Sequence, residues 1–223
     1  MEINQKHKLE LLESLKGFMH FVQDPSQTSS VFEIQRGLSN QPISLRNVEH
    51  MLSNPAIKAL ADEQYQPARP SLTELIKLPE SSLGYHYAKS LLDAGFDPDF
   101  FETIAVIGPG TYLDLRVRQT HDIWHVMTGF GTDLAGEVGL QAFQLTQIYS
   151  PLSVLISAAG ILHCMTLGMD LDPVLDAVHQ GIEISRTKVP MLSVKWEQYW
   201  EEPVDRLREM IGLKVAHYTP VYQ

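Results

Sequence analysis

Cysteine and positive charge are both scarce in this sequence, and each scarcity excludes a class of protein. Cys164 is the one cysteine among 223 residues, which excludes a disulfide within these residues and a cysteine-rich zinc finger. Lysine and arginine number 17 against 27 aspartate and glutamate residues, which gives a formal net charge of −10. Because such a chain has no basic field with which to hold a phosphate backbone, nucleic acid is not an expected partner.

The pattern of charged and apolar residues also shows neither a targeting signal nor a membrane span. Residues 1–18 mix lysine and glutamate with leucine, so they resemble neither a secretory signal nor a transit peptide. The most apolar stretch, residues 152–169, is thinned by Ser153, Ser157 and His163, and we interpret it as a buried helix rather than a membrane span. These features and the single cysteine predict a cytoplasmic protein, with peripheral contact to a membrane left open.

Helical periodicity dominates the chain. Apolar residues between Leu9 and Val22 recur every three or four positions, which is the spacing of one helix face. Similar stretches follow along the sequence, residues 98–104 among them, whereas only residues 104–107 have the β-branched density of a strand. We therefore predict an all-α fold, a multi-helix bundle with an N-terminal helical arm.

Pro67 and Pro70 mark the predicted joint between this arm and the rest of the chain. Two prolines within four residues cannot continue a helix and hold the chain extended. We expect residues 1–68 to form the arm and residues 69–223 to form a metal-binding helical core.

The densest set of metal-competent side chains consists of His121, Asp122 and His125. On a helix the two histidines are about 40° apart, and the aspartate is about 60° to 100° from each, so all three share one side. Two imidazoles and a carboxylate suit a divalent ion such as zinc, iron or manganese.

Glu137 joins this set if the helix ends before it. On one unbroken helix, Glu137 would lie roughly 24 Å along the axis from His121 and about 160° around it. Gly129 and Gly131 interrupt the pattern, however, and Thr132 and Asp133 follow as the expected N-cap and first-turn residue of a new helix. A reversal there would bring His125 and Glu137 to one level on antiparallel neighbours, which predicts Glu137 as a fourth ligand.

Other interpretations of the motif remain open. Two histidines four residues apart are often a surface coincidence, and Asp122 can instead interact with Arg118, one turn earlier. The motif also differs from the zinc-protease helix, in which glutamate follows the first histidine as general base. Peptide hydrolysis is therefore disfavoured.

The spacing His-Asp-x-x-His, followed after eleven residues by Glu137, resembles the hallmark of the ubiquinone (coenzyme Q) biosynthesis protein Coq-four family. The likeness runs from about Leu72 to Leu213. Further matching pieces are Gly84-Tyr85, Asp97-Pro98, Arg116-x-Arg118, Gly129, Gly136-Glu137 and the run from Trp200 to Arg208.

This resemblance implies an all-helical, metal-binding protein that handles polyprenylated quinone precursors. Family members are described as organisers of other pathway proteins and as acting at ring carbon one, where a carboxylate is lost and a hydroxyl gained. By position, the family's metal residues fall on His121, Asp122, His125 and Glu137, with zinc, iron, manganese and magnesium all left open.

The chain also departs from the family pattern near this motif. Gln141 and Gln144 stand where lysine and glutamate are expected, and His163 stands where a basic residue is usual. These changes alter the charge near the expected headgroup site, so the substrate and the reaction stay open.

Residues 138–169 contain no charged side chain. A site that binds a prenyl tail needs such an apolar lining, because an unpaired charge beside the tail would be costly. Arg118 is the candidate for holding an anionic headgroup. The alternative is that these helices simply form the core and that the arginine is solvated. The candidate substrate-binding residues are Arg118, Phe143, Ile148, Leu152, Leu155 and Ile156.

Three functions are consistent with these patterns. The first is a metal-dependent protein of prenylquinone synthesis that decarboxylates and hydroxylates a polyprenyl benzoate. The second is a non-catalytic scaffold that presents a lipid intermediate to other quinone-biosynthesis proteins. The third is a metal-dependent phosphohydrolase of isoprenoid phosphates. A second copy of the chain, in a homodimer, is a further expected partner.

Overall fold

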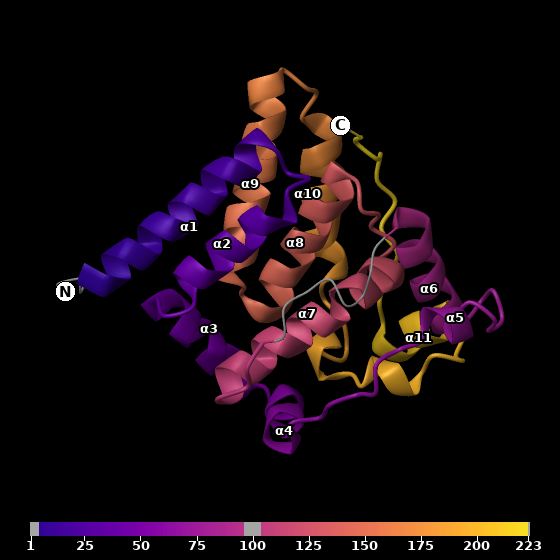
Figure 1. The fold of residues 1–223 in the computed structure, drawn as a ribbon. Coiled ribbons are helices and arrows are strands. Elements are labelled where there is room, and N and C mark those ends of the chain that lie inside the picture. The colour runs from indigo at the N-terminus through magenta and orange to yellow at the C-terminus, as the bar shows by residue number, and fades with distance from the viewer. Residues whose placement is uncertain (1–4, 96–103, 223) are drawn as a thin grey trace. The chain divides into compact units, whose positions relative to one another are not determined.

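The computed structural model describes residues 5–95 and 104–222, and helices account for all the regular structure in them (Figure 1). No strand occurs in this part of the chain; Ser82 and Pro203 form an isolated bridge. The predicted all-α class is confirmed. The α-helices are α1 (Gln5–Gln23), α2 (Thr28–Leu38), α3 (Pro42–Ser53), α4 (Pro55–Glu63), α5 (Leu72–Leu75), α6 (Leu83–Ala94), α7 (Pro109–Thr128), α8 (Leu134–Ile148), α9 (Pro151–Leu167), α10 (Asp172–Ile184) and α11 (Val204–Ile211), and the 3-10 helices are η1 (Met191–Ser193) and η2 (Trp196–Gln198).

The helix expected over residues 98–104 lies, except for its last residue, outside the described residues, as does the Asp97-Pro98 pair. Residues 104–107 are irregular rather than extended in a sheet. Because no second strand of the described chain accompanies them, their β-branched side chains have no ladder to join.

The expected break between the two metal-motif helices is present. Gly129 ends α7 in the left-handed conformation with a φ of 82°, which favours glycine. The N-cap of α8 is Asp133 and not Thr132, because the Asp133 carboxylate accepts a hydrogen bond from the Gly136 N–H at 3.2 Å. The sequence-based assignment was therefore wrong by one residue.

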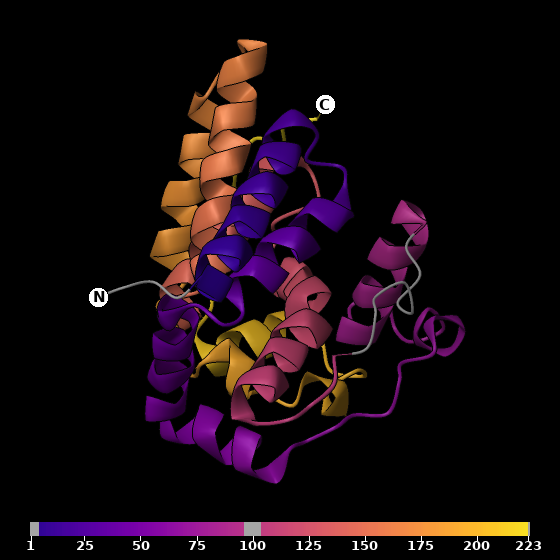
Figure 2. The same cartoon turned by 60° about the vertical axis from the view of Figure 1, so that its left-hand side comes forward.

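Contacts between helices divide the chain into two compact units. The first takes in the residues up to Met51, residues 130–185 and the residues from Ala216 onward. In it, α8 contacts both α9 and α10, and the antiparallel helices α1 and α2 pack against α9 (Figure 2). Phe21 and Val22 of α1 form a buried cluster with Ile156 and Ala159 of α9. The division into an arm, residues 1–68, and a core, residues 69–223, stays a prediction.

Glycines allow α8 to approach its neighbours closely. A Cβ added at Gly160 of α9 would lie 2.6 Å from Val138, and one added at Gly181 of α10 would lie 2.2 Å from the carbonyl oxygen of Gly139. The second contact involves backbone, so the two helices would have to move apart to relieve it.

We therefore expect Gly181→Ala to lower the free energy of unfolding by about 1–3 kcal/mol, despite the better helix propensity of alanine. Urea denaturation measures this change. Gly108→Ala is the control, because a Cβ at Gly108 meets no atom of the described residues within 4 Å and the φ of this residue is 177°. An equal or higher stability of Gly181→Ala would contradict the close packing of α8 and α10.

The second unit consists of the described residues from Leu52 to Gly129 and from Arg186 to Val215. Its central helix is α7, which contacts α4, α6, α11 and η1. Arg116 of α7 is completely buried, and its Nη1 donates to Glu197 at 2.8 Å. The helix that carries both motif histidines is thus tied into its unit by a buried ion pair.

The apolar stretch that the sequence analysis singled out forms α9. Ser153 and His163 are buried on it, and His163 Nδ1 lies 2.8 Å from the carbonyl oxygen of Val22. Its other side is exposed at Val154 and Met165, so the expected burial holds for one side only. No helix in the described residues has the length and apolar character needed to cross a bilayer.

Candidate metal centre

His121 and His125 lie one turn apart on α7 and face the same way, as the spacing predicts. Their Nε2 atoms are 3.2 Å apart, and the two rings meet edge to face with centroids 4.8 Å apart. His125 is buried, with 7% of its surface exposed, whereas His121 is half-buried. A ligand could therefore reach the pair from the side of His121.

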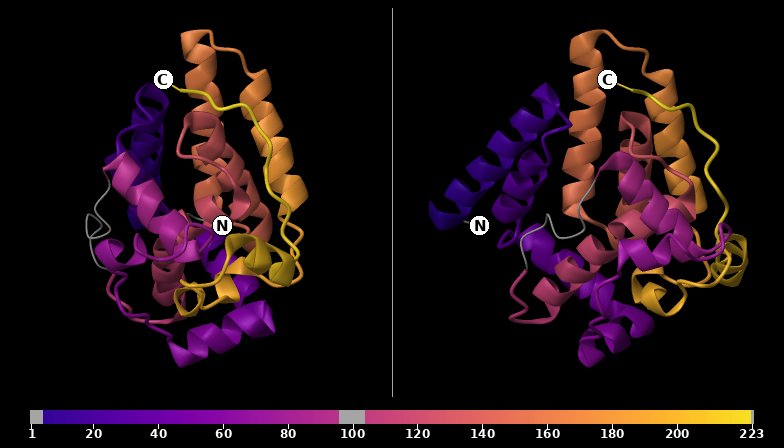
Figure 3. Two further views of the ribbon diagram at one scale, coloured as in Figure 1. Left: turned by 90° about the vertical axis from the view of Figure 1, so that its right-hand side faces the viewer. Right: turned by 45° about the vertical axis from the view of Figure 1, so that its right-hand side comes forward.

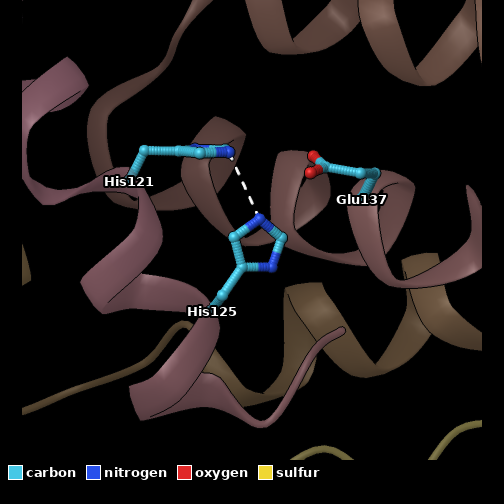
Figure 4. Close-up of side chains that lie close together, drawn as sticks. All are labelled: His121, His125 and Glu137. Carbon is cyan, nitrogen blue, oxygen red and sulfur yellow. Dashed lines mark hydrogen bonds between the residues drawn. The ribbon is translucent and has the colours of Figure 1, made fainter. Parts of the chain in front are cut away.

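Glu137 stands in the first turn of α8, where its backbone N–H donates to the carbonyl oxygen of Asp133 at 2.8 Å. One ligand atom from each of His121, His125 and Glu137 can be chosen so that all three lie within 4.8 Å of one another. Figure 4 shows the two imidazoles and the carboxylate pointing toward a common point.

The geometry of the three residues fits a divalent ion. Two nitrogens bound to zinc at about 2.0–2.1 Å in a tetrahedral arrangement lie roughly 3.3 Å apart. The two Nε2 atoms are separated by 3.2 Å, which is very near that spacing. Two imidazoles and one carboxylate form a set that zinc and iron both accept, and it leaves at least one coordination position for water or a substrate oxygen.

Asp122 is not in this group of three residues. It is half-buried on α7. Burial raises the pKa of the Tyr87 hydroxyl, and the negative charge of Asp122 raises that pKa further. Asp122 thus lies near Tyr87, and its role as a ligand stays a prediction.

The two arginines before the motif have different surroundings. Arg116 is buried against Glu197 and also donates to Gln119 at 3.0 Å, so its guanidinium is engaged within the protein. Arg118 is half-buried. Its charge lowers the pKa of Asp114, although burial, the larger effect, raises that pKa above its usual value. Arg118 as a headgroup ligand stays a prediction.

The candidate tail-binding residues of α8 and α9 do not form one group. Phe143 and Ile148 are buried on α8, and Phe143 lies where α8 meets Gly181 of α10. Ile156 belongs to a buried cluster with Phe21, and Leu152 packs against that cluster. Leu155, also on α9, is half-buried. These residues therefore contribute to helix packing, and their contact with a lipid stays a prediction.

Sequence reasoning missed two groups that hold the ends of the motif helices. Arg208 donates to the carbonyl oxygens of Val126 and Met127 at 2.9 Å each, in the last turn of α7. Tyr218 donates to Asp133 at the start of α8. Arg208 lies in the run from Trp200 to Arg208 that resembles the family, which is the one signal that could have indicated it.

Comparisons with known proteins agree with this resemblance. Residues 5–217 match the family described as coenzyme Q (ubiquinone) biosynthesis protein Coq4. Two relatives are named ubiquinone biosynthesis protein COQ4, mitochondrial. The one from Talaromyces marneffei is 30% identical, and the match covers 74% of this chain and 58% of the relative. The one from Eremothecium gossypii is 28% identical, and the match covers 74% of this chain and 52% of the relative. The chain thus spans little more than half the length of these relatives.

A solved structure has the same fold. It is the crystal structure of a protein assigned by name to ubiquinone biosynthesis, from Nostoc punctiforme PCC 73102, and the match has a TM-score of 0.80 at 30% identity over 90% of this chain and 96% of the other. The word mitochondrial in the relatives' names differs from the cytoplasmic location expected from the sequence. The match over residues 5–217 confirms the resemblance: this chain belongs to the Coq4 family of coenzyme Q (ubiquinone) biosynthesis proteins.

Proposed function

We propose that this chain binds a divalent metal ion through His121, His125 and Glu137, and that the centre acts on a polyprenylated precursor of ubiquinone. The observation that carries the proposal is the convergence of these three side chains, whose ligand atoms lie within 4.8 Å of one another. A bound divalent ion supplies a Lewis acid that stabilises negative charge on ring oxygens or on a carboxylate. The two imidazoles contribute neutral ligands, and Glu137 contributes one negative charge.

The reaction that we propose takes place at ring carbon one of a polyprenyl benzoate. The bond between the ring carbon and the carboxylate breaks, carbon dioxide leaves, and a hydroxyl takes its place. Dioxygen is the oxidant and supplies the hydroxyl oxygen. A separate two-electron donor and two protons convert its second oxygen atom to water, and a third proton from solvent completes the ring hydroxyl. With His121, His125 and Glu137 as the protein ligands, a coordination position stays open for a substrate oxygen, which supports this function over the scaffold. A fourth ligand from Asp122 would close a tetrahedral zinc site and favour the scaffold instead.

Neutral polar groups beside Glu137 support a ring substrate rather than an isoprenoid phosphate. Gln141 lies one turn after Glu137 on α8 and is buried, and its Oε1 has no hydrogen-bond partner among residues 5–95 and 104–222. Gln144, also buried, lies one turn further. Phosphate recognition favours cationic donors, whereas an uncharged amide oxygen accepts a hydrogen bond from a ring hydroxyl.

We expect Gln141→Met to raise the Kd for a polyprenyl hydroxybenzoate about tenfold, because the variant keeps the side-chain volume but loses the acceptor. Fluorescence titration with detergent-solubilised substrate measures the Kd. The matched control is the same compound without its ring hydroxyl, for which wild type and variant should have equal Kd values. If Gln141→Met lowered the affinity equally for both compounds, Gln141 would not recognise the ring hydroxyl.

The proposed function is tested by incubating the metal-loaded protein with a polyprenyl hydroxybenzoate labelled with ¹³C in its carboxylate, under dioxygen and with a reductant. Labelled carbon dioxide and a ring hydroxyl should form in equal amounts. Substrate binding without turnover would favour the scaffold, and release of inorganic phosphate from geranylgeranyl phosphate would favour the phosphohydrolase. Mass spectrometry of lipids that co-purify with the protein identifies the tail and headgroup.

A further inference from the structure

The start of α8 is tied to residues 216–222. The Asp133 carboxylate accepts hydrogen bonds through Oδ1 from the Val221 N–H at 2.8 Å and from the Gly136 N–H at 3.2 Å. Its Oδ2 accepts a hydrogen bond from the Tyr218 hydroxyl at 2.5 Å. The N-cap residue of α8 therefore has two partners outside its own helix, and both come from this distant segment.

The Tyr218 hydroxyl also reaches the other side of the turn, because it accepts a hydrogen bond from the Gly131 N–H at 2.8 Å. Two glycines make room for it. A Cβ at Gly136 would lie 2.6 Å from the hydroxyl oxygen and 2.3 Å from the Gly131 carbonyl oxygen, and one at Gly131 would lie 2.9 Å from the hydroxyl oxygen. A side chain at position 131 or 136 would therefore collide with the Tyr218 hydroxyl, and glycine at both positions leaves the hydroxyl its space.

Further contacts fix the segment that carries Tyr218. The Tyr218 ring packs against the Phe130 ring, with centroids 5.2 Å apart. The Val221 carbonyl oxygen accepts a hydrogen bond from the Leu134 N–H at 3.0 Å. Figure 3 shows the segment, in yellow, running along α10, where Gln180 hydrogen-bonds to the backbone of His217. Burial raises the pKa of the Tyr218 hydroxyl, and its hydrogen bond to Asp133 raises that pKa further, so the hydroxyl remains a donor at neutral pH.

We propose that Tyr218 is a positioning residue for Glu137, an inference that rests on the proposed metal centre. Glu137 is four residues after Asp133, and its N–H donates to the Asp133 carbonyl oxygen at 2.8 Å. Any movement of the N-cap therefore moves the turn that carries the Glu137 carboxylate. By joining Gly131 to Asp133, the Tyr218 hydroxyl prevents the first turn of α8 from fraying and keeps that carboxylate in place.

The test replaces Tyr218 with phenylalanine, which removes the hydroxyl and keeps the ring that packs on Phe130. We expect the Kd for zinc to rise roughly tenfold, the lower end of the loss that follows when a group supporting a metal ligand is removed, because the lost hydrogen bond to the Asp133 carboxylate is only partly buried. In the metal-free protein, the backbone amides of Gly136 and Glu137 should exchange with solvent faster. Tyr222→Phe is the matched control, because Tyr222 lies in the same segment but is 78% exposed, and it should change neither quantity.

A double variant tests whether the effect passes through Glu137. In a Glu137→Gln background, Tyr218→Phe should cause no further loss of zinc affinity. An unchanged zinc Kd and unchanged exchange in Tyr218→Phe would overturn the proposal, as would an equal loss in Tyr222→Phe. Wild-type protein that binds no zinc would overturn the proposed metal centre instead, and the exchange rates would then decide whether Tyr218 holds the turn.

Discussion

Replacing His125 with alanine is expected to raise the Kd for zinc by more than about a hundredfold. His125 is the most buried of the three proposed ligands, with 7% of its surface exposed, and its Nε2 lies 3.2 Å from that of His121. Losing it leaves one imidazole and one carboxylate, which cannot enclose the ion. Since replacing residues behind the ligands already costs about tenfold to a hundredfold in affinity, losing a ligand should cost more.

Competition with a chromophoric chelator measures this Kd, and elemental analysis of the purified proteins measures the metal that each retains. His179→Ala is the control, because His179 is an exposed histidine on α10. It should bind zinc as wild type does. If His125→Ala and wild type retained equal zinc with equal affinity, the ion would be bound elsewhere and the proposed centre would be wrong.

Glu197→Ala is expected to lower the free energy of unfolding by about 3–5 kcal/mol, because it leaves a buried guanidinium without its carboxylate. Arg116 has none of its side chain exposed, and Glu197 has 8%. The pair has two contacts, from Nη1 at 2.8 Å and from Nη2 at 3.4 Å. The remaining partners of Arg116 are neutral: Gln119, the Val194 carbonyl oxygen and the Tyr65 ring, whose centroid is 5.5 Å away.

Urea denaturation measures the loss, and a surface pair provides the control. Arg206 donates to Glu202 at 2.8 Å, but 74% of the Arg206 side chain is exposed, so Glu202→Ala should cost less than about 1 kcal/mol. The double variant Arg116→Met with Glu197→Leu should recover most of the stability, because it removes both buried charges. A loss in Glu197→Ala as small as that in Glu202→Ala would show that the pair is not buried in solution.

The parts of the site that could be predicted are the local ones. The common direction of His121 and His125 follows from helix periodicity alone. The place of Glu137 follows from Gly129, which ends α7, and from the polar pair Thr132 and Asp133 before α8, although the N-cap is the second of this pair. Such signals act over one or two turns, so they can be recognised in a single sequence.

The parts that could not be predicted depend on residues far apart in the chain. Tyr218 meets Asp133 across 85 positions, and Arg116 meets Glu197 across 81. An amphipathic pattern shows that a helix has an apolar face but not which helix covers it. For the same reason, the sequence did not indicate that α1 packs on α9.

X-ray absorption at the zinc edge of the zinc-loaded protein tests the proposed metal centre, because it measures the atoms around the ion. We expect one zinc per chain with two imidazole nitrogens at about 2.0–2.1 Å and carboxylate oxygen in the same shell. The spectrum of His121→Ala should lose one imidazole. A shell of water oxygens with no imidazole, or a spectrum that His121→Ala leaves unchanged, would contradict the proposed centre.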